Sequence, residues 1–98
     1  MTNTNASLFD LGVCETSAFA REKLRKVATD PESLLSRHQC GDWGDVPDWR
    51  QRGNELAVRG EGNAPNVVVS RYTLSGDLDL MAVTSLTRKQ TRLQLFDE

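Results

Sequence analysis

The spacing of apolar residues changes near residue 66, and this change limits the folds that are open to the chain. From there on, strand-forming residues fill two segments, 67–74 and 78–84, and the turn residues Ser-Gly-Asp at 75–77 separate them. A second connection at 86–90 precedes residues 91–96, in which polar and apolar side chains alternate. This order predicts a meander of three antiparallel strands in the last third of the chain.

Before residue 66 the apolar residues recur at helical spacing in three segments. Ser17 has the side chain to cap a first helix, which carries Ala20, Leu24, Val27 and Ala28 along one side. Asp30-Pro31 is typical of a helix start and predicts a second helix over residues 31–38 that buries Leu34 and Leu35. A third helix is predicted to begin at Pro47, with a buried face made of Val46, Trp49, Leu56 and Ala57.

Together these segments predict an α+β fold in which N-terminal helices pack on a three- to four-stranded antiparallel meander sheet. A short apolar segment at residues 7–13 is the candidate for the fourth strand. The 98 residues have the size of one domain, so residues 1–98 are expected to form a single domain, with residues 1–6 as a flexible tail.

Charge, cysteine content and hydropathy disfavour several classes of protein. A formal net charge of −2 disfavours a protein that wraps nucleic acid, because such proteins usually present a strongly basic face. Two cysteines, Cys14 and Cys40, are too few for a disulfide framework; free thiols are expected, with a single disulfide as the alternative. The chain has neither a signal-peptide core nor a run of about 20 apolar residues, which predicts a cytoplasmic protein without a membrane partner.

The run of residues 37–45, Arg-His-Gln-Cys-Gly-Asp-Trp-Gly-Asp, contains the only histidine of the chain. His38, Cys40, Asp42 and Asp45 have donor atoms that bind metals, but their spacing differs from the paired spacings of structural zinc. Neither a metal nor a cofactor is therefore expected.

Nucleophilic catalysis from the same run is also disfavoured. His38 and Cys40 are two residues apart at a helix end, where their side chains point away from each other. Cys14 and Ser70 are left as residues that could meet His38 through space. Nothing in the sequence selects either, so no catalytic residue is predicted.

A structural role for the run is the simpler interpretation. Gly41 can end a helix, Asp42 can bond the amides of its own turn, and Trp43 can fill the space between helices and sheet. Asp45 stands near the positive N-terminus of the third helix. His38, Asp42, Trp43 and Asp45 are kept as candidate binding residues.

Basic residues form a second candidate binding site. Arg88, Lys89 and Arg92 lie around the last connection, and Arg71 lies on a strand predicted to be close by. Gathered on one surface, they could bind phosphates or an acidic protein patch. Aromatic residues do not interleave with them, so stacking of single-stranded bases is not expected. Dispersed charge is the simpler alternative.

The run Arg37-His38 and Gly41-Asp42-Trp43-Gly44-Asp45, followed by Asn54, Ser70-x-Tyr72, Thr84, Arg88 and Thr91, resembles a widespread family of small bacterial proteins. Its members occur on phages, plasmids and other mobile elements and are often labelled plasmid-related or restriction-subunit-like. The resemblance covers residues 33–96 and implies a genomic context rather than a settled activity. Where the family has Thr-Glu-Ala-Asp-Arg, this chain has Thr84-Ser85-Leu86-Thr87-Arg88, so an activity that needs those two carboxylates is not expected.

Three functions remain, in order of preference. The first is a non-enzymatic protein-binding accessory factor of a mobile genetic element, such as an inhibitor of a host defence complex of the CRISPR or restriction type. The second is a nucleic-acid-binding accessory protein that uses Arg88, Lys89 and Arg92. An enzyme centred on His38 and Asp42 ranks last. The expected partner is a protein, and a second copy that pairs through a sheet edge, giving a homodimer, is an alternative.

Overall fold

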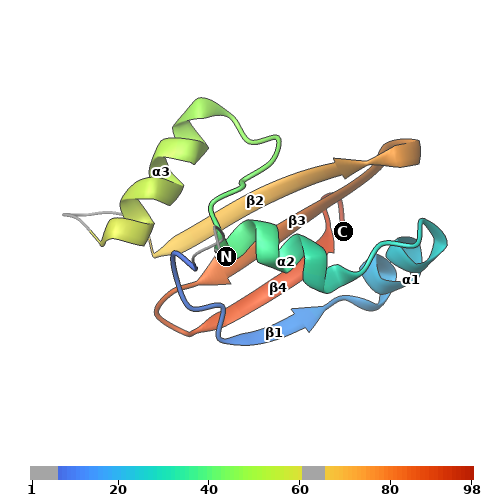
Figure 1. Cartoon of the computed structure of the whole chain (residues 1–98), viewed down its shortest axis with the longest axis horizontal. Coiled ribbons are helices and arrows are strands. Elements are labelled where there is room, and N and C mark those ends of the chain that lie inside the picture. Colours follow the sequence, from blue (N-terminus) through green and yellow to red (C-terminus); the bar gives the residue numbers. More distant parts are fainter. Residues whose placement is uncertain (1–6, 61–65) are drawn as a thin grey trace, which may run out of the picture.

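The computed structural model describes residues 7–60 and 66–98 and has an α+β fold (Figure 1). Within this part, a short strand precedes three helices, and three longer strands follow them. The elements in chain order are β1 (Val13–Thr16), α1 (Ala18–Lys26), α2 (Pro31–Gln39), α3 (Asp48–Arg59), β2 (Val67–Leu74), β3 (Leu78–Ser85) and β4 (Gln90–Leu95). The tail expected at residues 1–6 lies outside the described residues.

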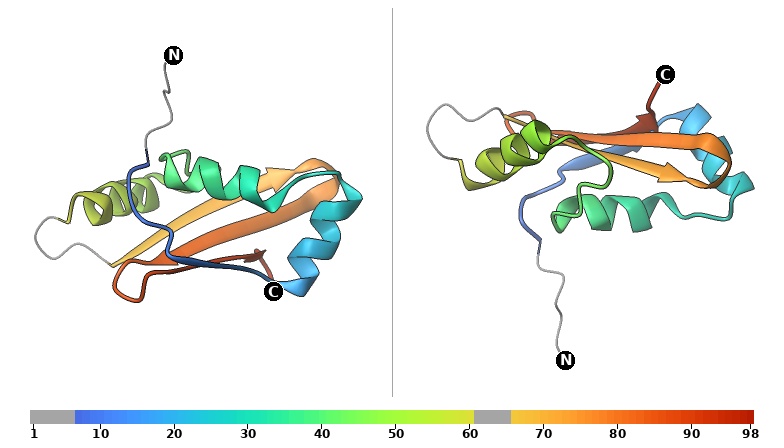
Figure 2. Two further views of the ribbon diagram at one scale, coloured as in Figure 1. Left: turned by 60° about the horizontal axis from the view of Figure 1, so that its bottom comes forward. Right: turned by 90° about the horizontal axis from the view of Figure 1, so that it is seen from above.

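The described strands form one mixed sheet in the order β1-β4-β3-β2. β2, β3 and β4 pair antiparallel, which confirms the predicted meander, and Val83 lies opposite Val69 on one side and Arg92 on the other. α2 lies across one side of this sheet, while α1 and α3 lie toward its two ends (Figures 1 and 2).

The prediction of a purely antiparallel sheet is wrong at the fourth strand. β1 covers Val13–Thr16 instead of residues 7–13, and it runs parallel to β4. Gly12 explains the late start, because its φ is 67° and a Cβ there would lie 1.9 Å from the carbonyl oxygen of Lys89. The chain thus crosses the β3–β4 turn at Gly12 and pairs only beyond it. Three helices and two strands separate β1 from β4, so no tight turn imposes an antiparallel direction.

The caps that the sequence predicts for α1 and α2 are present. Ser17 Oγ accepts a hydrogen bond from the amide of Ala20 at 3.0 Å, and Asp30 Oδ1 accepts one from the amide of Glu32 at 3.0 Å. The two helices share one core with the sheet, made of Ala20, Leu24, Leu34, Leu35, Tyr72, Leu80, Ala82 and Leu93. Both helices therefore bury their apolar sides against the same face of the sheet.

The buried face predicted for α3 is partly wrong. Trp49 and Leu56 are 66% and 38% exposed, whereas Asn54 and Ala57 are buried. The reason is the position of α3, which lies along the outer edge of β2 (Figure 1). The Asn54 side chain there donates to the carbonyl oxygen of Val69 at 2.7 Å and accepts from its amide at 3.0 Å. A polar residue is thus selected at the contact, because it meets backbone rather than side chains.

The same edge of β2 is closed two residues further on by the segment around Gly44. The amide of Arg71 donates to the carbonyl oxygen of Trp43 at 2.9 Å, and the amide of Asp45 donates to the carbonyl oxygen of Arg71 at 2.7 Å. Gly44 has a φ of 73°, and a Cβ on it would lie 2.0 Å from the carbonyl oxygen of Arg71. Only glycine fits this approach of backbone to backbone.

Replacing Gly44 with alanine should therefore lower the free energy of unfolding by at least about 3 kcal/mol, because a backbone clash adds to the left-handed conformation. Gly60→Ala is the matched control, since Gly60 has a φ of 68° and nothing within 4 Å of the Cβ position. The control should lose only about 1–2 kcal/mol. Urea denaturation followed by tryptophan fluorescence measures both, and equal losses would contradict the edge contact.

Candidate functional site

His38 is the centre of a chain of buried hydrogen bonds that crosses the core. Its Nδ1 lies 2.6 Å from Oγ of Ser70 on β2, and its Nε2 lies 2.9 Å from Oγ1 of Thr84 on β3. Thr84 Oγ1 is 2.7 Å from Oγ1 of Thr91 on β4, whose hydroxyl donates to the carbonyl oxygen of Leu11 at 2.6 Å. The four side chains are each 0–1% exposed. We call this set the His38 chain.

The last bond of the His38 chain sets the direction of all the others. A carbonyl oxygen can only accept, so the hydroxyl of Thr91 donates to Leu11 and accepts from Thr84. Thr84 Oγ1 then accepts from His38, which places the imidazole proton on Nε2. Nδ1 is left as an acceptor for the hydroxyl of Ser70. One neutral tautomer of His38 thus satisfies every member.

This arrangement does not support catalysis by His38. Ser70, one of the residues that sequence alone left open as a partner, does meet the imidazole, but both side chains are fully buried. The other ring nitrogen bonds a threonine rather than an orienting carboxylate. Burial lowers the pKa of His38 to about 4, so the ring is neutral at physiological pH. Cys14 lies exposed on β1.

The remaining residues of the 37–45 run hold the loop between α2 and α3. Arg37 Nε donates to Asp42 Oδ2 at 2.7 Å, which lowers the pKa of the Asp42 carboxyl. The Tyr72 hydroxyl donates to the carbonyl oxygen of Asp42 at 2.7 Å. Trp43 is 5% exposed and stacks on Phe9 with ring centroids 6.3 Å apart.

The candidate binding residues of this run therefore divide into two groups. His38 and Trp43 lie inside the core, and neither offers a surface to a partner. Asp42 and Asp45 are exposed, with Asp42 in an ion pair and the amide of Asp45 bonded to β2. The residues that carry the family resemblance, with Asn54, Ser70, Tyr72, Thr84 and Thr91 among them, hold the fold through these bonds.

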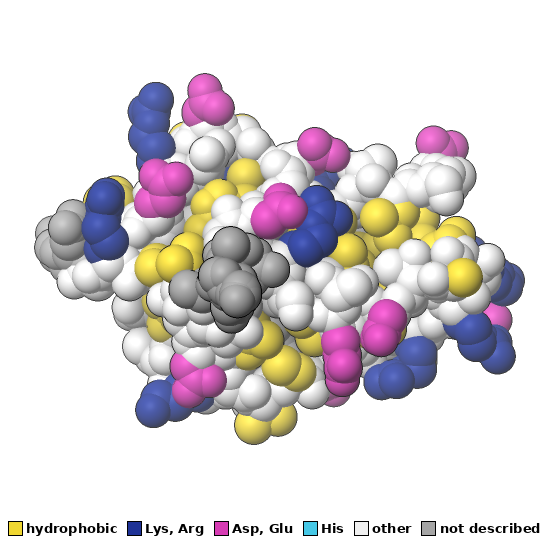
Figure 3. All heavy atoms as spheres, in the orientation of Figure 1, with side chains coloured by type: hydrophobic (Ala, Val, Ile, Leu, Met, Phe, Trp, Pro, Cys, Tyr) yellow, Lys and Arg dark blue, Asp and Glu magenta, His cyan; other side chains and the backbone are white. Residues whose placement is uncertain are grey.

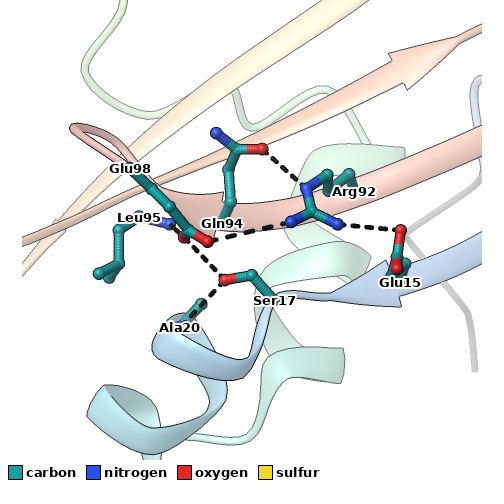
Figure 4. Close-up of polar contacts among 7 residues, drawn as sticks. All are labelled: Glu15, Ser17, Ala20, Arg92, Gln94, Leu95 and Glu98. Atoms are coloured by element: carbon teal, nitrogen blue, oxygen red, sulfur yellow. Dashed lines mark hydrogen bonds and ion pairs between the residues drawn. The ribbon is translucent and has the colours of Figure 1, made fainter.

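Two of the four basic candidates are paired with carboxylates. Arg71 makes a two-pronged contact with Asp79, with Nη2 2.6 Å from Oδ2, and its guanidinium lies 3.9 Å from the centre of the Phe96 ring. Arg92 Nη1 lies 2.9 Å from Oε1 of Glu15 (Figure 4). Glu98 belongs to the same network, because its Oε2 lies 3.9 Å from Nη2 of Arg92. Its carboxylate also accepts hydrogen bonds from the hydroxyl of Ser17 and from the amide of Leu95 (Figure 4).

The structure brings Arg88 and Arg92 together but leaves Arg71 apart from them. Arg88 and Arg92 line one hollow of about 710 Å³ with Ser85, Gln90 and Gln94. Lys89 sits at a φ of 56° in the β3–β4 turn, where its carbonyl oxygen accepts from the amide of Val13. On the face that bears α2, acidic and basic side chains are interspersed (Figure 3). Of the four basic candidates, Arg88 and Arg92 thus share one hollow, and Arg71 does not line it.

The face of the sheet opposite α2 is a candidate binding surface, of which the sequence indicated Arg71 and Arg92 but not the apolar centre. Its side chains occupy the alternate positions of β2, β3 and β4 that point away from the core, and they include Val67, Val69, Arg71, Asp79, Met81, Val83, Arg92 and Gln94. We call it the open face. The run of three valines hid it, since it does not show which valines point outward. The available signal was Arg71 and Thr73, which alternate with the apolar residues Tyr72 and Leu74 and so mark the odd-numbered positions of β2 as outward.

The remaining observations concern metals, thiols and membranes. Within residues 7–60 and 66–98, no three His, Cys, Asp or Glu side chains come together in a group that could hold a metal ion. Cys14 and Cys40 are both free thiols. In the same described part, every helix is too short or too polar to cross a membrane.

The burial of His38 predicts a dependence of stability on pH. Its pKa is about 4 in the fold against 6.5 for the free side chain, so the unfolded chain binds more protons between these values. The free energy of unfolding should fall by about 3 kcal/mol from pH 7 to pH 4, apart from the loss from carboxylates near pH 4. The His38→Gln variant should lack the part of this slope between pH 6.5 and 5.

An NMR titration provides the direct check, because the chain has a single histidine and its ring signals are unambiguous. A midpoint near 4, or unfolding before protonation, is expected. A midpoint near 6.5 in the folded protein would contradict the buried neutral ring.

Comparisons with known proteins complete the description of the site. Neither a protein-family model, nor a curated protein, nor a solved structure matches this chain. The resemblance to proteins of mobile elements stays a prediction that depends on the motif residues alone. The function is therefore inferred from the surfaces that the fold presents.

Proposed function

We infer that this chain is a non-enzymatic protein-binding accessory factor whose main contact surface is the open face. The observation that carries the proposal is the unequal use of the two faces of the sheet. α1 and α2 pack on one face, and in the described part of the chain no helix lies across the other (Figure 2). His38 and Ser70, which have side chains suited to catalysis, are buried in the core and bonded to each other.

The composition of the open face suits a protein partner. Val69 and Val83 are opposite each other on paired strands, and Met81 and Val67 extend this apolar centre. The ion pairs Arg71–Asp79 and Arg92–Glu15 lie beside it. An apolar centre with a charged rim is the usual anatomy of a protein interface. The half-buried valines also keep apolar area available for burial.

The identity of the partner is proposed from the resemblance. Proteins of that family occur on mobile elements, and a small binding protein in that setting has a host defence complex of the restriction or CRISPR type as its natural target. Such a complex works in the cytoplasm. The chain would then act by occupying a protein surface of the complex, without a cofactor and without chemistry of its own.

The Val83→Glu variant tests the proposal. It places a carboxylate in the apolar centre of the open face beside Arg92, which should weaken binding about tenfold or more, because a charged and hydrated side chain replaces apolar area that a partner would bury. Leu56→Glu on α3 is the matched control at an exposed leucine away from this face. The readout is the plating efficiency of a phage on hosts that carry a restriction or a CRISPR system.

Wild-type protein and the Leu56→Glu control should raise plating on one such host, and Val83→Glu should not, with thermal denaturation showing that both variants fold. No effect of the wild-type protein on any host contradicts the proposed target. Full activity of Val83→Glu contradicts the proposed surface.

Nucleic-acid binding is the competing function, and the ion pairs of Arg71 and Arg92 argue against it. We expect no retardation of DNA or RNA at low ionic strength, where contacts to phosphate are strongest. Retardation that falls steeply with salt and is lost in an Arg88→Ala, Lys89→Ala double variant would contradict this expectation. It would identify the β3–β4 turn as a nucleic-acid-binding site.

A further inference from the structure

The two edge strands of the sheet, β2 and β1, differ in whether their outward backbone groups are hydrogen-bonded. On β2, the outward backbone groups of Val69 are bonded by Asn54, and those of Arg71 by the segment around Gly44. On β1, Val13 and Ser17 donate to carbonyl oxygens of the β3–β4 turn and of β4, so the odd-numbered residues face the sheet. The backbone groups of Cys14 and Thr16 therefore point outward.

These outward groups are open to a further strand. Among the described residues, the backbone hydrogen bonds outside helices and strands include none to the amide or carbonyl group of Cys14 or Thr16. Cys14 is exposed and Thr16 is half-buried. An exposed strand edge of this kind is a template for pairing with an extended segment.

A groove runs beside this edge. It has a volume of about 560 Å³, with Cys14, Glu15 and Thr16 of β1 on one side. The start of α2 contributes Pro31, Glu32 and Leu35, and Arg21 and Asp30 complete the lining. In Figure 2 (left), β1 is the front edge of the sheet, with α1 beyond its end. A strand edge that faces a helix across a groove is the geometry in which an extended peptide binds as an added strand.

The charge of the groove selects the occupant. Asp30 and Glu32 line it against the single guanidinium of Arg21, and Glu15, which is paired with Arg92, adds a third carboxylate. Pro31 and Leu35 beside them offer apolar contacts to the aliphatic stems of lysine or arginine side chains. Because every second side chain of an extended segment would face α2, the groove suits a segment with lysine or arginine at every second position.

A second copy of the chain would meet like charges in the register that pairs both outward residues of each strand. Antiparallel pairing of two β1 strands, with Cys14 of each opposite Thr16 of the other, would place the two Glu15 side chains directly opposite each other. Like charges in that position are destabilising. We propose that the groove between β1 and the start of α2 binds an extended basic segment of a partner protein as a fifth strand of the sheet. This site shares only Glu15 with the rim of the open face and does not depend on the function assigned to that face.

The test uses the whole chain and a capped hexapeptide, Lys-Val-Lys-Val-Lys-Val, as the probe. Fluorescence anisotropy should give a Kd below about 1 mM, whereas the peptide with glutamate in place of lysine should not bind. A strand added at an edge uses the amides of alternate residues only. Two further peptides carry N-methyl groups, one on its lysine amides and the other on its valine amides. One of the two should therefore lose binding, and the other should keep it.

Variants of the protein test whether the peptide binds in the groove. Glu32→Lys should weaken binding about fivefold or more, while Glu55→Lys, a charge reversal at an exposed position of α3, should leave it unchanged. Val83→Glu should bind the probe like the wild-type chain, which separates this site from the open face. In NMR hydrogen exchange, the peptide should protect the amides of Cys14 and Thr16.

Three results would overturn the proposal. No binding at 1 mM peptide, or equal binding of both N-methylated peptides, excludes strand addition. Chemical-shift changes at the methyl groups of Val69 and Val83, without protection at Cys14 and Thr16, move the peptide to the open face. Self-association of the chain in sedimentation, with Cys14 and Thr16 protected in the absence of peptide, assigns the edge to a second copy.

Discussion

The His38 chain fixes how the helices sit on the sheet. It joins α2 to β2 and β3 through the two ring nitrogens, and it continues through Thr91 to Leu11, the segment that leads into β1. Each donor in it has one acceptor, and the terminal carbonyl sets the direction. Removing any member would leave a polar group buried without a partner, at a cost of about 1–3 kcal/mol.

A polar chain at this place specifies register more than it adds stability. An apolar core of equal volume could be as stable, because each buried polar group first loses its contact with water. If β2 or β3 slipped by one residue so that Val69 or Val83 took the place of Ser70 or Thr84, however, one ring nitrogen of His38 would be left unpaired. The mispaired sheet is thus penalised directly. Asn54 and Gly44 act in the same sense at the outer edge of β2, since each fits only one register.

The parts of the fold that follow from local chemistry could be predicted from the sequence. Caps at Ser17 and Asp30 and the alternation of residues 91–96 depend on neighbours in the chain, and the structure confirms them. The parallel pairing of β1 and the rotation of α3 depend on contacts with Lys89 and Val69, which are distant in sequence. For the same reason the 37–45 run looked ambiguous. His38 has the chemistry of a catalyst, and only Ser70 and Thr84, more than thirty residues away, make it structural.

The His38 chain also fixes the two walls of the groove between β1 and α2. His38 and Glu32 lie on one helix, so the bonds of His38 hold the wall of the groove that α2 provides. Leu11 lies two residues before Val13, so the far end of the chain holds the opposite wall, where β1 begins. The width of the groove is therefore set by buried hydrogen bonds rather than by the residues that line it. A change at a surface residue such as Glu32 would then leave the spacing of the groove fixed, so that, for the proposed peptide site, specificity can change while the fold stays the same.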